Sequence, residues 1–350
     1  MLKKAWCLAL DRAGRLRPSS FVLWIATYRC IFRCPFCEAR GGEAAPDELS
    51  GPEAREFLDD LWRMGVRRLL ISGGEPLLRE DLTELLDHAQ RRSITPALIS
   101  NGYLVQERWQ ELRRFRYFLF MTSLDGPAEE HDRVRARGSF ERALGALEMF
   151  ASIQVQTRVV KTIVHPGNLA QLPELAARLE ASSATDWHLS PAYAAGRARS
   201  QGQYQLSGDQ LKALVEFVGR VHGRGRLRVE LPHSHAYLHC LDGCAPARPL
   251  FCGAGLNRCA VMPNGDVLAC GQAYDAVPPE GNIRQAPLSQ IWRRGFGDFR
   301  QFSQPSACHG CRLWSVCQGG CWAERQIRGR CLRDVWMGTE CNVPNVAPTH

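Results

Sequence analysis

The sequence predicts an α/β fold in which a parallel sheet with crossover helices precedes a smaller, cysteine-rich unit. Strand-like and helical stretches alternate six times between residues 21 and 223, a pattern typical of parallel sheets. Eleven of the 15 cysteines fall between residues 240 and 341. The chain of 350 residues also exceeds the roughly 250 to 300 at which one hydrophobic core stops growing, so we expect more than one unit.

The strands and helices follow from the apolar pattern. The first strand is the run FVLWIATY, and the stretch GPEAREFLDDLWRMG after it has helical periodicity. The predicted strands cover residues 21–28, 66–72, 94–100, 117–124, 153–164 and 185–192. The predicted helices cover residues 51–65, 80–92, 105–114, 139–150, 168–180 and 207–223. We therefore divide the chain into an N-terminal extension (1–20), a barrel-like unit (21–230), and a connector with the cysteine-rich domain (231–350).

Unusual residues follow the first four strands. Three cysteines follow the first strand, and the next three strands end in Gly73-Gly74-Glu75-Pro76, Ser100-Asn101 and Ser123-Leu124-Asp125. Gly, Asn and Asp can simply turn the chain at such positions. Because chemistry in barrel-like sheets lies at the carboxyl ends of strands, four such ends in succession favour a site for a small polar ligand that carries an amine, a carboxylate and a ribose.

The cysteine content favours metal binding over disulfides, since the chain is large and lacks an export signal. The apolar run at the start ends at Asp11, and no cleavage site follows it. No apolar run approaches the roughly 20 residues of a membrane helix. Neither a basic tract nor an interleaved aromatic stripe is present, so we expect no nucleic-acid partner. These features predict a cytoplasmic protein without a membrane segment.

Cys30, Cys34 and Cys37 lie within eight positions and have no fourth ligand nearby. Structural zinc takes four ligands, and catalytic zinc commonly recruits a nearby His, Asp or Glu; the nearest downstream histidine is His88. A [4Fe–4S] cluster held by three thiolates leaves one iron open. The amine and carboxylate of a ligand held by the other strand ends could chelate that iron.

These motifs resemble those of the radical SAM superfamily, whose members bind a cluster and S-adenosylmethionine (SAM). The Cys-x3-Cys-x2-Cys triplet with Phe36, the GGEP sequence and the SLDG strand end carry the resemblance. It implies a partial (β/α)6 barrel and reductive cleavage of SAM to a 5′-deoxyadenosyl radical. The GGEP motif would bind the amine of the methionine part of SAM. Ser123 and Arg135 would contact the carboxylate or the ribose of SAM. The implied SAM contacts are Phe36, Gly73, Gly74, Glu75, Pro76, Ser100, Asn101, Ser123, Asp125 and Arg135.

The C-terminal cysteines resemble the SPASM domain of radical SAM enzymes. The run CHGCRLWSVCQGGC follows a Cys-x12-Gly-x4-Cys pattern that starts at Cys252. A zinc ribbon would use the same Cys-x2-Cys knuckles and is the alternative. The resemblance implies two auxiliary [4Fe–4S] clusters, for a total of three. Their implied ligands are Cys252, Cys259, Cys270 and Cys321 for the first, and Cys308, Cys311, Cys317 and Cys341 for the second.

Four cysteines are left over: Cys7, Cys240, Cys244 and Cys331. We choose Cys341 over Cys331 as the last ligand, because its longer spacing from Cys321 leaves more chain for a return crossing. Cys240 and Cys244 lie among three histidines, but we expect a polar connector without metal there.

The resemblance also implies a reaction class and partners. SPASM enzymes similar to this chain mostly modify ribosomally made peptides or protein side chains, with a flavodoxin- or ferredoxin-type electron donor. Only 20 residues precede the first strand, so a leader-binding domain would be a separate protein. Sulfatase-maturing relatives carry an Asp directly after the cysteine that matches Cys270, whereas Gly271 stands here. A tetrapyrrole or other small molecule is the alternative substrate, and a non-catalytic zinc-binding protein is a third possibility.

Overall fold

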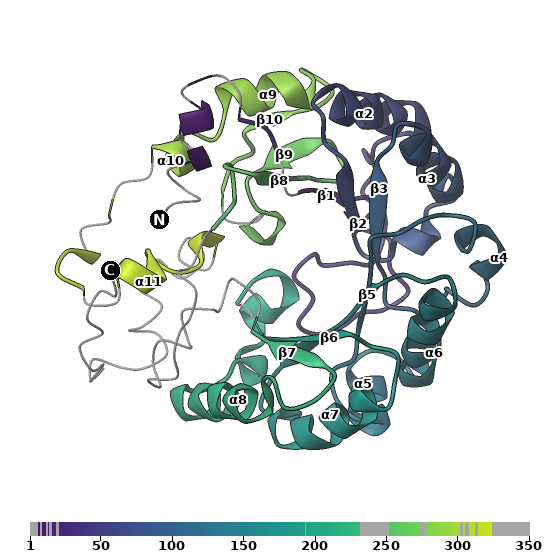
Figure 1. The fold of residues 1–350 in the computed structure, drawn as a ribbon, viewed down its shortest axis with the longest axis vertical. Coiled ribbons are helices and arrows are strands. Elements are labelled where there is room, and N and C mark those ends of the chain that lie inside the picture. Colours follow the sequence, from purple (N-terminus) through teal and green to yellow (C-terminus); the bar gives the residue numbers. More distant parts are fainter. Residues whose placement is uncertain are drawn as a thin grey trace.

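The computed structural model describes residues 6–7, 9–11, 13, 16–18, 21–192, 194–231, 252–273, 277–301, 304, 308–311 and 314–323. These residues form a 10-stranded sheet in the order β10-β9-β8-β1-β2-β3-β4-β5-β6-β7. Figure 1 shows the sheet curving into an incomplete ring with the larger helices on its outside. None of the described helices is long and apolar enough to cross a membrane.

The partial barrel is built from seven parallel strands and the helices that connect them. The strands are β1 (Phe21–Ile25), β2 (Arg68–Ser72), β3 (Thr95–Ile99), β4 (Leu119–Ser123), β5 (Thr157–Val164), β6 (Asp186–Pro191) and β7 (Arg228–Glu230). The helices are α2 (Gly51–Arg63), α3 (Leu82–Arg91), α4 (Trp109–Leu112), α5 (Ala128–Val134), α6 (Ser139–Ser152), α7 (Leu172–Glu180) and α8 (Gly208–Val221).

The predicted strand–helix alternation is confirmed. All six predicted strands are present, each shorter by a few residues, and all six predicted helical stretches contain a helix. The prediction missed β7, which has only three residues, and α5, which directly follows the SLDG strand end. Both are short, and hydrophobic periodicity has little power over so few residues.

The two faces of the barrel strands differ in burial. Side chains that face the helices are buried, as with Phe120 of β4, which stacks on Phe150 of α6 at 3.9 Å, and Trp187 of β6, which packs edge-on against Phe217 of α8. The alternate residues face the inside of the ring, and in β4 every one of these is only half-buried. The inner face is therefore partly open along β4, unlike the densely packed outer face.

The cysteine-rich part continues the same sheet. Strand β8 (Arg258–Val261) pairs in parallel with β1, so that Cys259 lies opposite Val22. Strands β9 (Asp266–Leu268) and β10 (Gly281–Asn282) follow in antiparallel order. Helices α9 (Leu288–Arg294), α10 (Gly297–Arg300) and α11 (Trp314–Cys317) complete the described part. Main-chain hydrogen bonds thus join the cysteine-rich segment directly to the first barrel strand.

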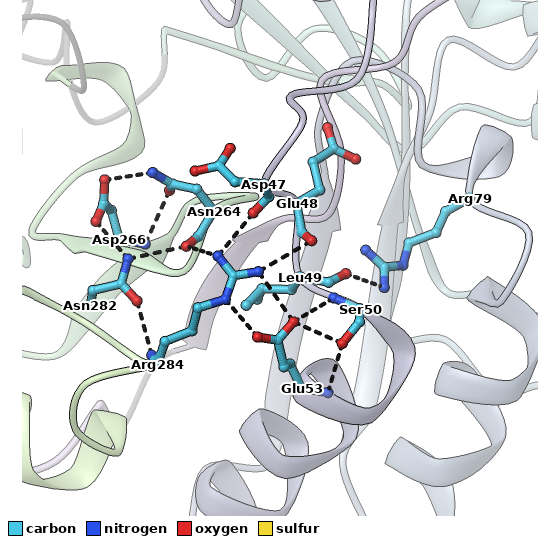
Figure 2. A network of polar contacts seen from close by, with 10 residues as sticks. All are labelled: Asp47, Glu48, Leu49, Ser50, Glu53, Arg79, Asn264, Asp266, Asn282 and Arg284. Carbon is cyan, nitrogen blue, oxygen red and sulfur yellow. Dashed lines mark hydrogen bonds and ion pairs between the residues drawn. The ribbon is translucent and has the colours of Figure 1, made fainter.

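Arg284 joins the segment after β10 to the start of α2 (Figure 2). Its guanidinium donates to both carboxylate oxygens of Glu53, at 2.6 and 3.1 Å, and to the carbonyls of Asp47 and Asn264 at 2.9 and 3.0 Å. Glu53 also caps α2 with Ser50 in a reciprocal capping box. The hydrogen bonds from Arg284, and then those from Ser50, lower the pKa of Glu53 to about 2. One arginine therefore ties both parts of the chain to a helix terminus.

Arg284→Ala should lower the free energy of unfolding by about 1–2 kcal/mol, because it removes charge-assisted hydrogen bonds to two segments. Denaturant unfolding at pH 7 would measure this loss. Arg293→Ala, at an exposed position on α9, is the control and should change stability by less than about 0.5 kcal/mol. Since the pKa of Glu53 is depressed, the contribution is present above pH 4.5 and disappears as the pH falls toward 2. Equal stability of the two variants would contradict this role.

Candidate functional site

The candidate site begins with the loop that follows β1. In Figure 1 this loop is the purple coil that crosses the middle of the ring. Its base is closed by two backbone hydrogen bonds, Cys30 N to Gly42 O at 2.8 Å and Gly42 N to Tyr28 O at 2.7 Å. The Glu48 carboxylate fixes the return of the loop, since it accepts from Tyr28 N at 2.7 Å and Thr27 Oγ1 at 2.8 Å. The three predicted cluster cysteines lie within this closed loop.

The chemistry of the three thiols fits a bound iron–sulfur cluster. Burial, with smaller contributions from nearby Glu75, Cys34 and Cys37, raises the pKa of Cys30 to about 11, against the hydrogen bond from Phe32 N. Burial also raises the pKa of Cys34, although Arg135 and Arg197 oppose this. Adjacent buried thiolates repel one another unless a cationic centre lies between them, which is what a cluster core provides.

The two glycines of GGEP allow the end of β2 to lie directly against the cysteine loop. Gly74 N donates to Thr27 O at 2.8 Å, and Glu75 N donates to Arg29 O at 2.7 Å. A Cβ atom on Gly74 would lie 2.3 Å from Arg29 O and 2.5 Å from Tyr28 O. Only glycine allows this approach, so the motif also has a structural role in seating the loop.

The Glu75 side chain joins the ends of β2 and β3. Its buried carboxylate accepts from Ser100 Oγ at 2.9 Å, Asn101 N at 2.8 Å and Leu77 N at 3.0 Å. Burial raises its pKa from 4.5 to about 7, although these hydrogen bonds favour the charged form. Asn101 Nδ2 is buried and makes no hydrogen bond to a described residue, so it remains available to a ligand. Glu75 thus contacts protein groups, and the contact of the GGEP motif with a ligand amine stays a prediction.

Asp125, Arg135 and Phe36 form a second group at the strand ends. Asp125 is fully buried; its carboxylate accepts from Arg135 Nε at 2.5 Å and from Ile163 N at 2.9 Å. Burial opposes ionisation of Asp125, but Arg135 and His131 outweigh it, so its pKa lies below the ordinary value. The Arg135 guanidinium lies 5.9 Å from the ring centre of Phe36. Arg135 is thus committed to an internal ion pair, and its contact with SAM stays a prediction.

Ser123 belongs to a polar row that sequence analysis did not detect. In the registers of β4 to β7, Ser123 lies opposite Lys161, Lys161 opposite His188, and His188 opposite Glu230. All four side chains are half-buried, and their strand neighbours Thr122, Thr162 and Trp187 are buried on the helix-facing side. The row therefore lines the inside of the barrel. Combining the predicted strands with their two-residue period could have identified Lys161 and His188.

Arg197 is a further residue that sequence analysis missed. It follows β6, and its side chain donates to Cys34 O at 2.8 Å and Gly41 O at 2.9 Å, while its backbone N donates to Cys37 O at 3.1 Å. Its Nη2 is buried and has no hydrogen-bond partner among the described residues. Gly196 precedes it with φ of 55°, and a Cβ there would lie 2.2 Å from Cys37 O. The sequence gives no local signal for this role, because the partners Cys34 and Gly41 are more than 150 residues away along the chain.

The auxiliary-cluster cysteines are partly described. Cys259 and Cys321 are buried, and Cys252, Cys270 and Cys317 pack against the same apolar core. Burial, with a smaller contribution from the neighbouring Cys252, raises the pKa of Cys270 to about 11. Cys311 N donates to Cys308 O at 3.1 Å in the knuckle that those two residues form. No disulfide joins the described cysteines. The predicted ligand Cys341, its alternative Cys331, and Cys240 and Cys244 lie outside the described residues.

Comparison with known proteins identifies the family. The model of the radical SAM superfamily matches residues 24–179, and that of the SPASM iron–sulfur cluster-binding domain matches residues 252–312. The mycofactocin maturase MftC of Mycolicibacterium smegmatis is 31% identical over 316 residues, which cover 87% of this chain and 79% of that protein. This chain belongs to the radical SAM superfamily. The resemblance drawn from its motifs is thereby confirmed.

Two further similar proteins support the assignment of this chain as a radical SAM/SPASM enzyme. The AdoMet-dependent heme synthase of Oleidesulfovibrio alaskensis is 26% identical over 325 residues, covering 86% of this chain and 82% of that protein. The crystal structure of Streptococcus suis SuiB bound to S-adenosylmethionine superposes with a TM-score of 0.71 at 18% identity, covering 90% of this chain and 76% of SuiB. SuiB therefore has the same fold. Membership of an enzyme superfamily rules out the non-catalytic zinc-binding alternative.

Arg135→Met should destabilise the protein by about 3–5 kcal/mol, because it leaves the buried Asp125 carboxylate without its cation. Thermal unfolding should then shift down by about 10 °C. Asp125→Asn combined with Arg135→Met should cost less than the sum of the single changes. Arg178→Met is the control, since Arg178 and its partner Glu141 are both exposed; it should cost less than about 1 kcal/mol. Strictly additive losses would refute the coupling of Asp125 and Arg135.

Proposed function

We propose that this enzyme oxidatively modifies a side chain of a ribosomally made peptide or protein. The observation that carries the proposal is the similarity to mycofactocin maturase over 87% of the chain. Bound SAM and a reduced cluster on Cys30, Cys34 and Cys37 would supply the 5′-deoxyadenosyl radical that removes a hydrogen atom from the substrate. The modification would be a crosslink, a thioether or an oxidised residue.

The chain's own residues would place these cofactors. Glu48 and Arg197 hold the cysteine loop in its closed form. The GGEP backbone, Asn101 Nδ2 and Ser123 are the groups that we assign to SAM. Phe36 stacks on His165 at 5.6 Å, which fixes the aromatic ring beside Cys37. The buried Nη2 of Arg197 would place positive charge beside the thiolates, where it favours their ionised form.

The SPASM domain would bind two fully ligated auxiliary clusters, for three clusters in total. Cys252, Cys259, Cys270 and Cys321 are the assigned ligands of one, and Cys308, Cys311, Cys317 and Cys341 of the other. The shared core around Cys259 and Cys321 and the match to a cluster-binding domain support this assignment. Full ligation leaves no open iron for the substrate, so these clusters would transfer electrons. A flavodoxin- or ferredoxin-type donor, a separate leader-binding protein and a cytoplasmic location complete the proposal.

The polar row on the inner wall would contact the substrate. Lys161 and His188 lie next to each other in register, between Ser123 and Glu230. This wall offers a cation, an imidazole and a carboxylate within a partly open space. Such groups can orient a polar side chain or peptide backbone for hydrogen removal. The similarity to heme synthase makes a tetrapyrrole the second candidate substrate. It ranks second because the chain is 26% identical to the heme synthase and 31% identical to the maturase.

Anaerobically purified enzyme should contain ~12 irons with equal sulfide and form 5′-deoxyadenosine from SAM under reduction. The Cys30→Ala/Cys34→Ala/Cys37→Ala variant should keep about two thirds of the iron and form no deoxyadenosine. Peptides encoded beside the gene should lose about two mass units by mass spectrometry. Stoichiometric zinc, or deoxyadenosine formation by the triple variant, would overturn the proposal. An unchanged peptide pool together with a modified tetrapyrrole would establish the second candidate.

Lys161→Met should lower the amount of modified peptide formed per deoxyadenosine by about tenfold, because a misplaced substrate is attacked less efficiently. Liquid chromatography of both products from one reaction would give the ratio. Lys212→Met is the matched control, since Lys212 is half-exposed on the outer helix α8. A ratio equal in the two variants would remove Lys161 from the substrate wall.

A further inference from the structure

A histidine lies between two carboxylates on the inner wall of the barrel, where β6 pairs with β7 (Figure 1). Asp186 and His188 are two residues apart in β6 and so share one face of the sheet, and Glu230 of β7 lies opposite His188. One imidazole nitrogen and one oxygen of each carboxylate all lie within 4.8 Å of one another. Asp186 is buried, and the other two residues are half-buried. We call these three residues the carboxylate–histidine cluster.

The charges around the carboxylate–histidine cluster disfavour a bound metal ion. Both carboxylate oxygens of Asp186 are already engaged, one by Arg228 Nη2 at 2.7 Å and the other by Thr185 Oγ1 at 2.6 Å. On the other side, Lys161 of β5 lies opposite His188. A guanidinium and an ammonium so close to the cluster would repel a divalent ion. The arrangement is therefore better suited to holding a proton than to holding a metal.

An imidazole in these surroundings can accept a proton near neutral pH, because the ordinary pKa of histidine lies close to that range. Among the described residues of β5, β6 and β7, the charged groups that face His188 are Lys161, Asp186 and Glu230. Arg228 is further away and forms an ion pair with Asp186. The two carboxylates favour the imidazolium that forms when His188 accepts a proton, whereas Lys161 opposes it.

The cluster lies on the same wall as a residue that we assign to SAM. Ser123, Lys161 and His188 form one row across β4, β5 and β6. Since neighbouring strands are about 4.8 Å apart, His188 lies roughly 10 Å from Ser123 along this row. This separation leaves room for a substrate side chain between the two residues. A hydrogen atom and a proton can thus leave the substrate on different sides.

We propose that His188 is the proton acceptor of the oxidation, an inference that rests on the function proposed above. One hydrogen leaves a substrate carbon as an atom and goes to the 5′-deoxyadenosyl radical. A second leaves a substrate oxygen, sulfur or nitrogen as a proton and goes to the imidazole. The one remaining electron passes to an auxiliary [4Fe–4S] cluster, the oxidant of this step. The carbon and the heteroatom then share a new bond, which is a double bond in an oxidised residue and a single bond in a crosslink or thioether.

The test uses the complete enzyme with its clusters, SAM and the peptide identified by its mass loss. His188→Gln should lower the amount of product formed per deoxyadenosine by at least about 100-fold, because proton transfer to a positioned base typically contributes that much. Iron content is measured alongside. His88→Gln is the matched control, since His88 also contacts a carboxylate, that of Asp59 at 2.8 Å, but from the outer helix α3. The control should stay within about twofold of the parent.

Two further measurements separate proton transfer from structural damage. Added imidazole should raise product formation by His188→Gly at least about tenfold and leave His88→Gly unchanged, because a free imidazole can replace only a missing base. In the parent enzyme, product per deoxyadenosine should fall as the pH drops and the imidazole becomes protonated. Glu230→Gln should move this fall to lower pH, since it removes a carboxylate that favours the imidazolium.

Equal product ratios in His188→Gln and His88→Gln would overturn the proposal. Failure of imidazole to restore product in His188→Gly protein with a normal iron content would also do so. Tight binding of added Mn²⁺ that is lost in His188→Gln would replace the proton acceptor with a metal site. Deoxyadenosine formation without any peptide product in the parent enzyme would instead count against the proposed function.

Discussion

The contact between the Gly74 peptide and the end of β1 is the constraint on which the site depends. Two backbone hydrogen bonds, from Gly74 N and Glu75 N, hold the first turn of the cysteine loop against the end of β2. Because Gly74 has no side chain, its backbone can lie this close to the loop. The buried Glu75 carboxylate extends the contact to β3, since it accepts a hydrogen bond from Asn101 N. Three strand ends thus become one rigid unit, from which the loop carries its thiols toward the interior.

Three arginines also hold the cysteine loop in place through hydrogen bonds to its backbone carbonyls. Arg79 donates to Ala26 O and Leu49 O at the two ends of the loop, and Arg197 donates to Cys34 O and Gly41 O in its middle. Arg284 donates to Asp47 O and Glu48 O from beyond β10. A planar guanidinium can bridge two carbonyls in fixed geometry, which lysine cannot do as well. A segment with almost no regular secondary structure is in this way fixed by three distant parts of the chain.

Much of this arrangement could be predicted from sequence because it is local. The strands, the triplet of cysteines and the GGEP and SLDG ends are adjacent in the chain and have their own patterns. Arg197 and Glu48 could not be found in this way, since each acts through a contact that only the closed fold creates. The two-residue period of the strands can place Lys161 and His188 on the inner face, but their position opposite each other depends on strand register, which the hydrophobic pattern alone does not define. The ion pair of Arg135 with the buried Asp125 also depends on the closed fold, and the contact of Arg135 with SAM stays a prediction.

The parallel pairing of β8 with β1 has a consequence for dissecting the enzyme. A fragment that ends after β7 would leave β1 with a row of unsatisfied main-chain donors and acceptors along the side that β8 covers. Such an edge is a template for pairing with any other extended chain, including another copy of the fragment. The cysteine-rich segment therefore acts as a protective border of the barrel sheet, in addition to any cofactor that it binds. A gene that encodes the barrel without the cysteine-rich segment would therefore produce a protein that associates with itself through the exposed edge of β1.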